Sequence, residues 1–268
     1  MIKHMLKAAE EAGKNSLTYF RTDDIQTKLK VDHQDIVTVA DVESQRIIVD
    51  ILTKALIEDG VPEEEIGFIG EEQLVKKGKH TFIIDPIDGT SNFATGLDYY
   101  CVSIGYAVDE VLTAGVVYHP ISRTFFYAEK GKGAYKRVDG DDMKLTVTDA
   151  PLSEKFLGTY LFEDDDLVKA VMTLQSSARG MRSLGAGALD ICHVADNLFG
   201  VALYLYMRLW DIAAAAVIVT EAGGVMYDWE GNELVFDFED VNKKYYYIAS
   251  HASYKEEVMK ALTQVKSV

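Results

Sequence analysis

The sequence contains only two cysteines among its 268 residues, Cys101 and Cys192, and each stands among apolar neighbours. Two isolated thiols exclude a framework of several disulfides, and without a CxxC pair they also exclude a cysteine-based metal site. We therefore predict that both thiols are buried and reduced, which suits a cytoplasmic location.

Proline is also scarce, with four residues in the whole chain, and no stretch rich in proline, glycine or serine divides the sequence. This composition argues against a flexible tether between independent domains. Residues 1–268 are enough to form a single domain with a large buried core. Within that domain we predict two subdomains, roughly residues 1–150 and 151–268, that share one cleft.

Basic residues are few relative to acidic ones. The chain has 27 Lys and Arg against 43 Asp and Glu, which gives a formal net charge of −16. This balance argues against a nucleic acid polymer as a partner, because polymer binding depends on a broad basic face. A small anionic substrate remains compatible with the charge, because a bound divalent cation reverses the sign of the field locally.

Long apolar runs are missing as well. No segment approaches the roughly 20 apolar residues that a membrane-spanning helix requires. The first residues, from Met1 to Met5, do not begin an extended apolar stretch of the kind found in signal peptides. We therefore expect no membrane partner and a protein of the cytoplasm.

Apolar residues recur at both helical and strand spacings, which predicts a mixed α/β (α+β) chain. Helices are expected over residues 2–20, from about 41 to 60, near 165–176, 187–199 and 211–222, and after a Ser253–Glu256 capping box. Strands are expected over 66–70, 82–85, 102–108, 112–118, 124–129, 180–184, 200–205 and 245–250, with a tight hairpin turn at Asp109-Glu110.

The most informative segment runs from Thr81 to Phe93 and reads TFIIDPIDGTSNF. Its apolar start predicts a buried strand. Two carboxylates, Asp85 and Asp88, stand at the end of this strand, where α/β sheets place their ligands. Gly89 permits unusual dihedral angles, and Thr90 can cap a following helix. Carboxylates bind hard cations and the N–H groups at a helix start bind phosphate, so the segment predicts a site for both.

Three further acidic residues stand at the ends of predicted elements. Asp41 opens the second helix, Glu71 ends a strand, and Asp211 opens a helix that is apolar almost all round. For Asp41 or Asp211 taken alone, a helix N-cap is the simpler interpretation. Asp85 and Asp88 are harder to explain as an ordinary turn, because two like charges this close raise a pKa unless a cation lies between them.

The spacing of the acids excludes two other kinds of site. An aspartyl-phosphate phosphatase carries a D-x-D-x-T pattern, whereas this chain has D-x-x-D-G-T from Asp85 to Thr90. The sequence also contains no D-x-D-x-D-G loop with the following Glu that defines an EF-hand.

Three segments, in this order along the chain, resemble the motifs of the inositol monophosphatase family, the magnesium-dependent, lithium-sensitive phosphatases. The segments are Ile69-Gly70-Glu71-Glu72, then Asp85 to Phe93, then Trp210 to Ala214 followed by Glu221-Ala222-Gly223-Gly224. The resemblance covers nearly the whole chain. It implies a layered αβαβα sandwich, a homodimer, and hydrolysis of a small phosphorylated polyol or sugar of the inositol monophosphate class.

The resemblance also implies a set of metal ligands. A first Mg²⁺ is expected on Glu71, Asp85 and the backbone carbonyl of Ile87, and a second on Asp85, Asp88 and Asp211. A third, weaker ion would share Glu71. Such ions supply hydroxide at neutral pH and neutralise the phosphate charge. Attack by water would then be direct and in line, and the lack of a plausible Ser, Cys or His nucleophile arrangement agrees with this.

Catalytic and substrate-binding roles follow from the same resemblance. Thr90, hydrogen-bonded to Asp41, is expected to help activate the attacking water, and Lys30 is expected near the metals. The expected substrate contacts are Asp88, Gly89, Thr90, Ser91, Gly185, Ala186, Gly187, Tyr204, Arg208 and Asp211.

One position departs from the family pattern. Inositol-binding members carry a Glu seven residues before the C-terminal Asp, where this chain has Tyr204. A tyrosine could stack on a sugar face or a base, and Arg208 could meet a second phosphate or lie solvated at the surface. Fructose 1,6-bisphosphate, NADP(H) and nucleotide 2′- or 3′-phosphates therefore stay open as substrates. A protein that keeps the fold but regulates by binding partners is a further alternative.

Overall fold

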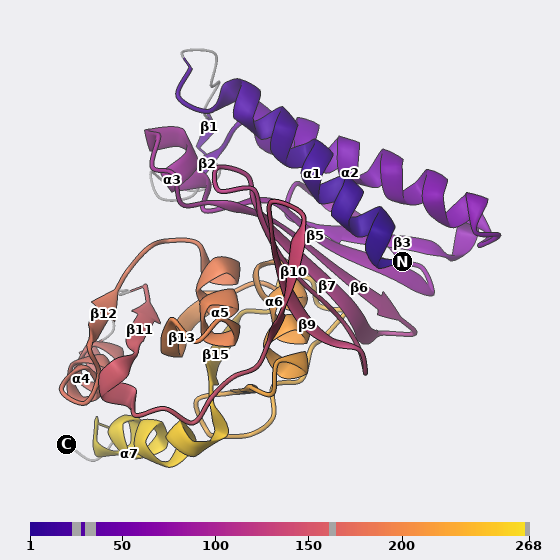
Figure 1. Cartoon of the computed structure of the whole chain (residues 1–268). Helices are drawn as coiled ribbons and strands as arrows, with labels where there is room; N and C mark the ends of the chain where they lie inside the picture. The colour runs from indigo at the N-terminus through magenta and orange to yellow at the C-terminus, as the bar shows by residue number, and fades with distance from the viewer. Residues whose placement is uncertain (23–27, 30–35, 161–164, 266–268) are drawn as a thin grey trace.

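The computed structural model of the protein describes residues 1–22, 28–29, 36–160 and 165–265. Its helices, labelled as in Figure 1, are α1 Ile2–Tyr19, α2 Val39–Glu58, α3 Thr90–Thr95, α4 Asp165–Gln175, α5 Gly187–Ala195, α6 Leu209–Glu221 and α7 Lys255–Val265. Its strands are β1 Lys28–Leu29, β2 Ile36–Val37, β3 Ile66–Gly70, β4 Leu74–Lys76, β5 His80–Asp88, β6 Cys101–Val108, β7 Val111–His119, β8 Thr124–Glu129, β9 Gly133–Val138, β10 Asp141–Leu145, β11 Phe156–Thr159, β12 Gly180–Arg182, β13 Phe199–Met207, β14 Val225–Tyr227 and β15 Tyr245–Ser250.

Helices and sheets alternate in five layers (Figure 1). α1 and α2 pack on one face of an eight-stranded sheet with the order β10-β9-β8-β7-β6-β5-β3-β4. α5 and α6 fill the space between this sheet and a five-stranded sheet with the order β12-β11-β13-β15-β14. α4 and α7 cover the outer face of the second sheet. The predicted αβαβα sandwich is confirmed.

The starts of α2 and α6 differ from the prediction in the same way. α2 begins at Val39 and α6 at Leu209, so Asp41 and Asp211 are each the third residue of their helix and not its cap. Each carboxylate instead reaches back and accepts a hydrogen bond from the backbone N–H of the residue before the helix. One carboxylate oxygen is thereby fixed, and the other is left for a different partner.

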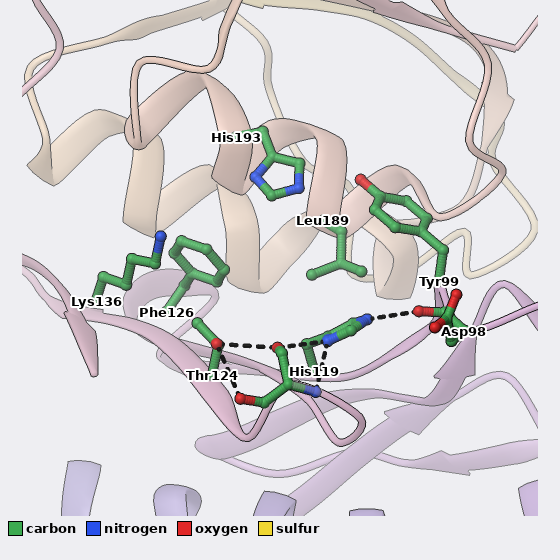
Figure 2. Close-up of a pocket in the computed structure, with 9 residues that line it drawn as sticks. Asp98, Tyr99, His119, Thr124, Phe126, Lys136, Leu189 and His193 are labelled. Atoms are coloured by element: carbon green, nitrogen blue, oxygen red, sulfur yellow. Dashed lines mark hydrogen bonds between the residues drawn. The ribbon is translucent and has the colours of Figure 1, made fainter. Parts of the chain in front are cut away.

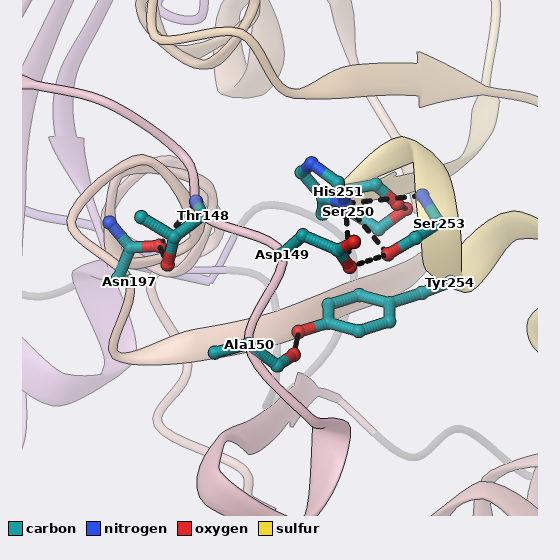
Figure 3. A network of polar contacts seen from close by, with 8 residues as sticks. All are labelled: Thr148, Asp149, Ala150, Asn197, Ser250, His251, Ser253 and Tyr254. Atoms are coloured by element: carbon teal, nitrogen blue, oxygen red, sulfur yellow. Dashed lines mark hydrogen bonds and ion pairs between the residues drawn. The ribbon is translucent and has the colours of Figure 1, made fainter.

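The segment that joins the two sheets is hydrogen-bonded along its length (Figure 3). The backbone N–H and the hydroxyl of Thr148 both donate to Asn197 Oδ1, each at 2.8 Å. Ser253 Oγ donates to Asp149 Oδ1 at 2.6 Å. These contacts fix the connection between the sheets, as expected for a chain without a flexible tether. The subdomain boundary near residue 150 stays a prediction.

The predicted Ser253–Glu256 capping box is wrong. Ser253 lies within a short 3₁₀ turn, Ala252–Tyr254, and α7 begins only at Lys255. The imidazole of His251 accepts the hydrogen bond from the Ser253 backbone N–H and so caps this turn. Ser253 was misread because its hydroxyl has a partner more than 100 residues away in the sequence, Asp149.

The hairpin between β6 and β7 is confirmed: Asp109 and Glu110 have φ values of 48° and 62°, as a type I′ turn requires.

Of the helices in the described parts of the chain, none is both long and apolar enough to cross a membrane.

Candidate metal and phosphate site

The central acidic motif lies at the end of β5. Asp85 and Asp88 are only 3% and 7% exposed, and the pairing of β5 with β6 changes register between them. Asp85 Oδ1 accepts a hydrogen bond from the Ile87 N–H at 3.0 Å, which folds the chain into a tight turn. Gly89 follows with a φ of 94°, and a side chain there would bring a Cβ atom within 3.1 Å of the Tyr99 carbonyl oxygen. Only glycine suits this position, which turns the chain into α3.

Asp88 links β5 to α5. Its Oδ1 accepts a hydrogen bond from the Gly187 N–H at 3.2 Å, and its Oδ2 accepts one from the Ala188 N–H at 2.8 Å. Both donors are in the first turn of α5, so a carboxylate from β5 caps a helix that is about 100 residues away in the sequence. Cys101 Sγ also donates to Oδ2 at 3.5 Å. Burial nevertheless raises the pKa of Asp88 to about 7.

Asp41 is fully buried and holds Thr90. Its Oδ2 accepts hydrogen bonds from the backbone N–H and the hydroxyl of Thr38, at 2.8 and 2.5 Å. The Thr90 hydroxyl lies 3.3 Å from Asp41 Oδ1 and 2.9 Å from the Ile87 carbonyl oxygen. Burial raises the pKa of Asp41 to about 7, and the charges of Glu71 and Glu72 act in the same direction. The expected Thr90–Asp41 hydrogen bond is present.

Glu71 and Asp211 bring further negative charge to Asp85. Glu71 follows β3, where its N–H donates to the carbonyl of Ile84 in β5. Asp211 stands in the first turn of α6, and its Oδ2 accepts from the Arg208 N–H at 2.7 Å. Burial raises the pKa of Asp85 well above its usual value, and the charges of its acidic neighbours raise it further. Burial likewise raises the pKa of Asp211.

One group of acidic residues within the described parts of the chain could hold a metal ion as it stands. One ligand atom each from Asp41, Glu71 and Glu72 lie within 4.8 Å of one another. Glu72 is a further ligand candidate. It belongs to the motif Ile69-Gly70-Glu71-Glu72, but the sequence assigned it no role. Its backbone is held by Gln45, which accepts from its N–H and donates to its carbonyl.

The expected substrate loop lies against the β5 turn. A Cβ atom built on Gly89 would lie 3.2 Å from the Gly185 carbonyl oxygen and 3.3 Å from the Ala186 Cβ. Asn92 in α3 fixes this approach, because its side-chain N–H₂ group donates to the carbonyls of Tyr99 and Leu184, both at 2.7 Å. The loop over 185–187 and the turn over 89–91 are therefore brought together, and their binding of substrate stays a prediction.

Two predicted substrate contacts have other partners. The ring of Tyr204 is 2% exposed and stacks on Tyr247, with ring centroids 5.5 Å apart, and its hydroxyl donates to Asp190. A ring covered in this way has no face to offer a sugar or a base, so the expected stacking does not fit the structure. The guanidinium of Arg208 donates to the carbonyl of Asn242 and is neither buried nor fully solvated.

Two other predicted residues complete the account. Ser91 is exposed on α3, beside Thr90. Lys30 lies outside the described residues.

Tyr99 also lines a pocket of about 220 Å³, shown in Figure 2. His119 on its floor donates from Nε2 to the Asp98 carbonyl and accepts at Nδ1 from the Ser122 N–H, so it is held neutral. Lys136 is paired with Asp196 at 2.6 Å. His119 and Lys136 are thus already engaged, whereas Nδ1 of His193 in the same pocket has no hydrogen-bond partner among the described residues. The acidic site, which gathers several carboxylates, is the better candidate for chemistry.

Comparison with known proteins agrees with the motifs. The sequence profile described as the inositol monophosphatase family matches residues 1–267. A fructose-1,6-bisphosphatase/inositol-1-monophosphatase of Thermotoga maritima is 34% identical over 213 residues, which cover 80% of this chain and 78% of that protein. Nus factor SuhB of Pasteurella multocida is 33% identical over 243 residues, which cover 86% of each chain.

A solved structure shows the same fold over the full length. The crystal structure of the extragenic suppressor protein suhB from Bartonella henselae is similar with a TM-score of 0.86 at 29% sequence identity. The match covers 100% of this chain and 99% of that one.

Proposed function

Because this chain belongs to the inositol monophosphatase family, and is therefore a phosphoric monoester hydrolase, we propose that it hydrolyses a small phosphorylated polyol or sugar with the help of bound Mg²⁺. One observation carries the proposal. Glu71, Asp85, Asp88 and Asp211 come from three separate segments, and their charges act on one another in a buried place.

The donor set fits a magnesium site. Asp85, Asp88 and Asp211 have raised pKa values and need a cation to remain ionised at neutral pH. Hard oxygen ligands are those that Mg²⁺ prefers. We assign a first ion to Glu71, Asp85 and the Ile87 carbonyl, and a second to Asp85, Asp88 and Asp211. The Ile87 carbonyl accepts from Thr90 and has a second lone pair for a metal.

A third, weaker ion fits the group of Asp41, Glu71 and Glu72. The family is metal-dependent, and two or three ions per site are proposed here for this chain.

When bound, Mg²⁺ supplies hydroxide at neutral pH and balances the charge of the phosphate. The chain itself orients the attacking water. The Thr90 hydroxyl donates its hydrogen bond to Asp41 or to the Ile87 carbonyl, so the lone pairs of its oxygen can accept a hydrogen bond from water. Thr38 keeps Asp41 in place by donating two hydrogen bonds to its other carboxylate oxygen. Water held in this way attacks the phosphorus in line, and the bond from phosphorus to the ester oxygen breaks on the opposite side. The alcohol leaves with a proton, which balances the proton lost by the attacking water.

The substrate is expected between the turn over Gly89 to Ser91 and the loop over Gly185 to Gly187. The backbone N–H groups of the first turn would receive the phosphate, and the loop would line the ring. The Arg208 backbone N–H donates to Asp211, a proposed metal ligand. We propose that the Arg208 side chain reaches the second phosphate of a bisphosphate substrate. Because this chain has Tyr204 where inositol-binding members carry a Glu, it lacks their acidic contact to ring hydroxyls, and we propose a broader substrate range than inositol monophosphate alone.

A phosphatase panel tests this function. Turnover should be measured with Mg²⁺ on inositol 1-phosphate, fructose 1,6-bisphosphate, NADP⁺ and adenosine 3′,5′-bisphosphate. We expect activity on at least one of the first two, and none in EDTA or in the Asp88→Asn variant. Equal activity of the variant would refute the metal assignment.

Partner binding is a second candidate function. It is favoured by the similarity to proteins named Nus factor SuhB, which spans 86% of both chains. An intact acidic site argues that catalysis is retained alongside any such role. A chain that is folded and binds Mg²⁺ but hydrolyses none of the four compounds would favour this second function.

We also propose that the protein works as a homodimer in the cytoplasm. The two cysteines are free and buried, as a reducing compartment allows. Light scattering coupled to size-exclusion chromatography would measure the mass of the assembly, and a monomer at micromolar concentration would contradict the dimer.

A further inference from the structure

A buried carboxylate lies on α5, about one turn after the N–H groups that donate to Asp88. Asp190 of α5 is 0% exposed, and each of its oxygens accepts a hydrogen bond from a tyrosine hydroxyl. Tyr99 donates to Oδ1 at 2.5 Å, and Tyr204 donates to Oδ2. A buried charge is normally paired or satisfied by hydrogen bonds, and here two phenols from different parts of the chain supply them.

The two tyrosines approach α5 from different elements. Tyr99 precedes β6 of the eight-stranded sheet, and Tyr204 lies in β13 of the five-stranded sheet. Asp190 is therefore a point at which both sheets hold the same helix. Residues three apart on a helix share a face, so Asp190 and Gly187 point in similar directions.

Gly187 is in contact with the same aromatic group. A Cβ atom built on Gly187 would lie 3.5 Å from the hydroxyl oxygen of Tyr247 and 3.9 Å from the ring of Tyr204. It would also come within 2.7 Å of the Met207 side chain. The first turn of α5 is therefore packed directly against these rings, and no larger residue fits without a shift. This is the turn whose N–H groups hold the Asp88 carboxylate.

We propose that Asp190, held by the hydroxyls of Tyr99 and Tyr204, is a positioning residue that sets the first turn of α5 against Asp88. It does not touch the substrate. It fixes the two N–H donors, and through them the direction in which the Asp88 oxygens face the metal site. The metal part of this statement rests on the function proposed above. Tyr204, at the position where inositol-binding members carry a Glu, thus has an indirect role in the site.

Single hydroxyl deletions test the proposal with little change in packing. Tyr204→Phe and Tyr99→Phe each remove one donor to Asp190 and keep the ring. Tyr227→Phe is the matched control, because Tyr227 is a buried tyrosine of the same five-stranded sheet whose hydroxyl pairs with Ser250. Hydrogen exchange of the Gly187 and Ala188 amides should be measured by NMR in EDTA, and Mg²⁺ binding by calorimetry.

In EDTA we expect the Gly187 and Ala188 amides to exchange about tenfold faster in Tyr204→Phe than in the wild type, after correction for global stability. We expect Mg²⁺ to bind about tenfold more weakly to this variant. Tyr227→Phe should change neither quantity. If the two amides exchange in Tyr204→Phe and Tyr99→Phe as they do in Tyr227→Phe, Asp190 does not position the turn and the proposal is overturned.

The two readouts separate the two proposals. Faster exchange with unchanged Mg²⁺ binding would support the positioning of the turn and refute the role of Asp88 as a ligand. Asp190→Asn adds a conservative test, because an amide keeps one acceptor and can donate to the other phenol oxygen. It should accelerate exchange less than Asp190→Ala, and equal acceleration by both would contradict the hydrogen-bonding role.

Discussion

Replacing Asp88 with asparagine is expected to stabilise the metal-free protein at pH 8 and to destabilise it at pH 4. Burial raises the pKa of Asp88 from 3.8 to about 7 in the folded state. The folded protein therefore binds this proton more tightly than the unfolded chain does. Stability is highest below pH 4 and falls as the pH rises toward 7, because in that window only the folded state retains the proton.

The size of the effect follows from the pKa difference. About three pKa units correspond to about 4 kcal/mol of unfolding free energy lost between pH 4 and 7. Asparagine avoids this loss, but its N–H₂ group would face one of the two backbone donors, Gly187 or Ala188, and leave that N–H without an acceptor. Such a loss costs about 1–3 kcal/mol. Asp88→Asn should thus be about 1–3 kcal/mol more stable than the wild type at pH 8, and about 1–2 kcal/mol less stable at pH 4, where the wild type has lost little.

Urea unfolding at the two pH values, in EDTA, measures both numbers. Asp50→Asn is a suitable control, because Asp50 is exposed on α2, and its substitution should leave the wild-type pH dependence unchanged. Mg²⁺ at one hundred times its Kd should stabilise the wild type by about 2.7 kcal/mol and the Asp88→Asn variant by much less. If the variant is less stable than the wild type by the same amount at both pH values, burial does not raise the pKa of Asp88 and the electrostatic reasoning fails.

Three further results are expected. Thr90→Ala should lower kcat at least about 100-fold with little change in Mg²⁺ affinity, whereas Thr90→Ser should keep most activity; steady-state kinetics over a Mg²⁺ titration would show whether the hydroxyl matters. Tyr204→Glu should destabilise the protein by about 3–5 kcal/mol at pH 8, because it places a second buried carboxylate beside Asp190, and an unchanged urea midpoint would argue against this contact. Millimolar Li⁺ should inhibit turnover relative to equal K⁺, and insensitivity would separate this chain from the lithium-sensitive members of its family.

The acidic residues of the site could be predicted because each stands in a short contiguous motif at the end of an element. Asp85 and Asp88 end a strand, where α/β sheets place their ligands, and Asp211 lies in the first turn of a buried helix. The resemblance to the family motifs is what groups Asp211 with the other two. The predicted starts of α2 and α6 are two residues late. A carboxylate at the third position of a helix, which accepts from the N–H of the residue before the helix, looks like a cap in the sequence.

Tyr204 was misjudged for a different reason. A count of seven residues back from Asp211 carries no information on which face of β13 a side chain occupies. The pairing of β13 with β15 shifts register between Tyr204 and Met207, and Tyr206 has a φ of 63°. This irregularity breaks the alternation from which direction is inferred in a strand. Asp190 was missed because its partners, 91 residues earlier and 14 later, meet it only in the folded chain.

Asp88 has two roles, and both favour its ionised form. As the acceptor for two N–H groups of α5 it is favoured as a carboxylate, and the same hydrogen bonds lower its pKa against the effect of burial. As a metal ligand it must also be ionised. The hydrogen bonds between Asp88 and the first turn of α5 are therefore strongest when Asp88 is ionised, and the ionised form is also the one that binds a cation. A neutral side chain at this position weakens the metal site and the cap of α5 together, so one carboxylate at the end of β5 serves both the cation and the helix that lies between the two sheets.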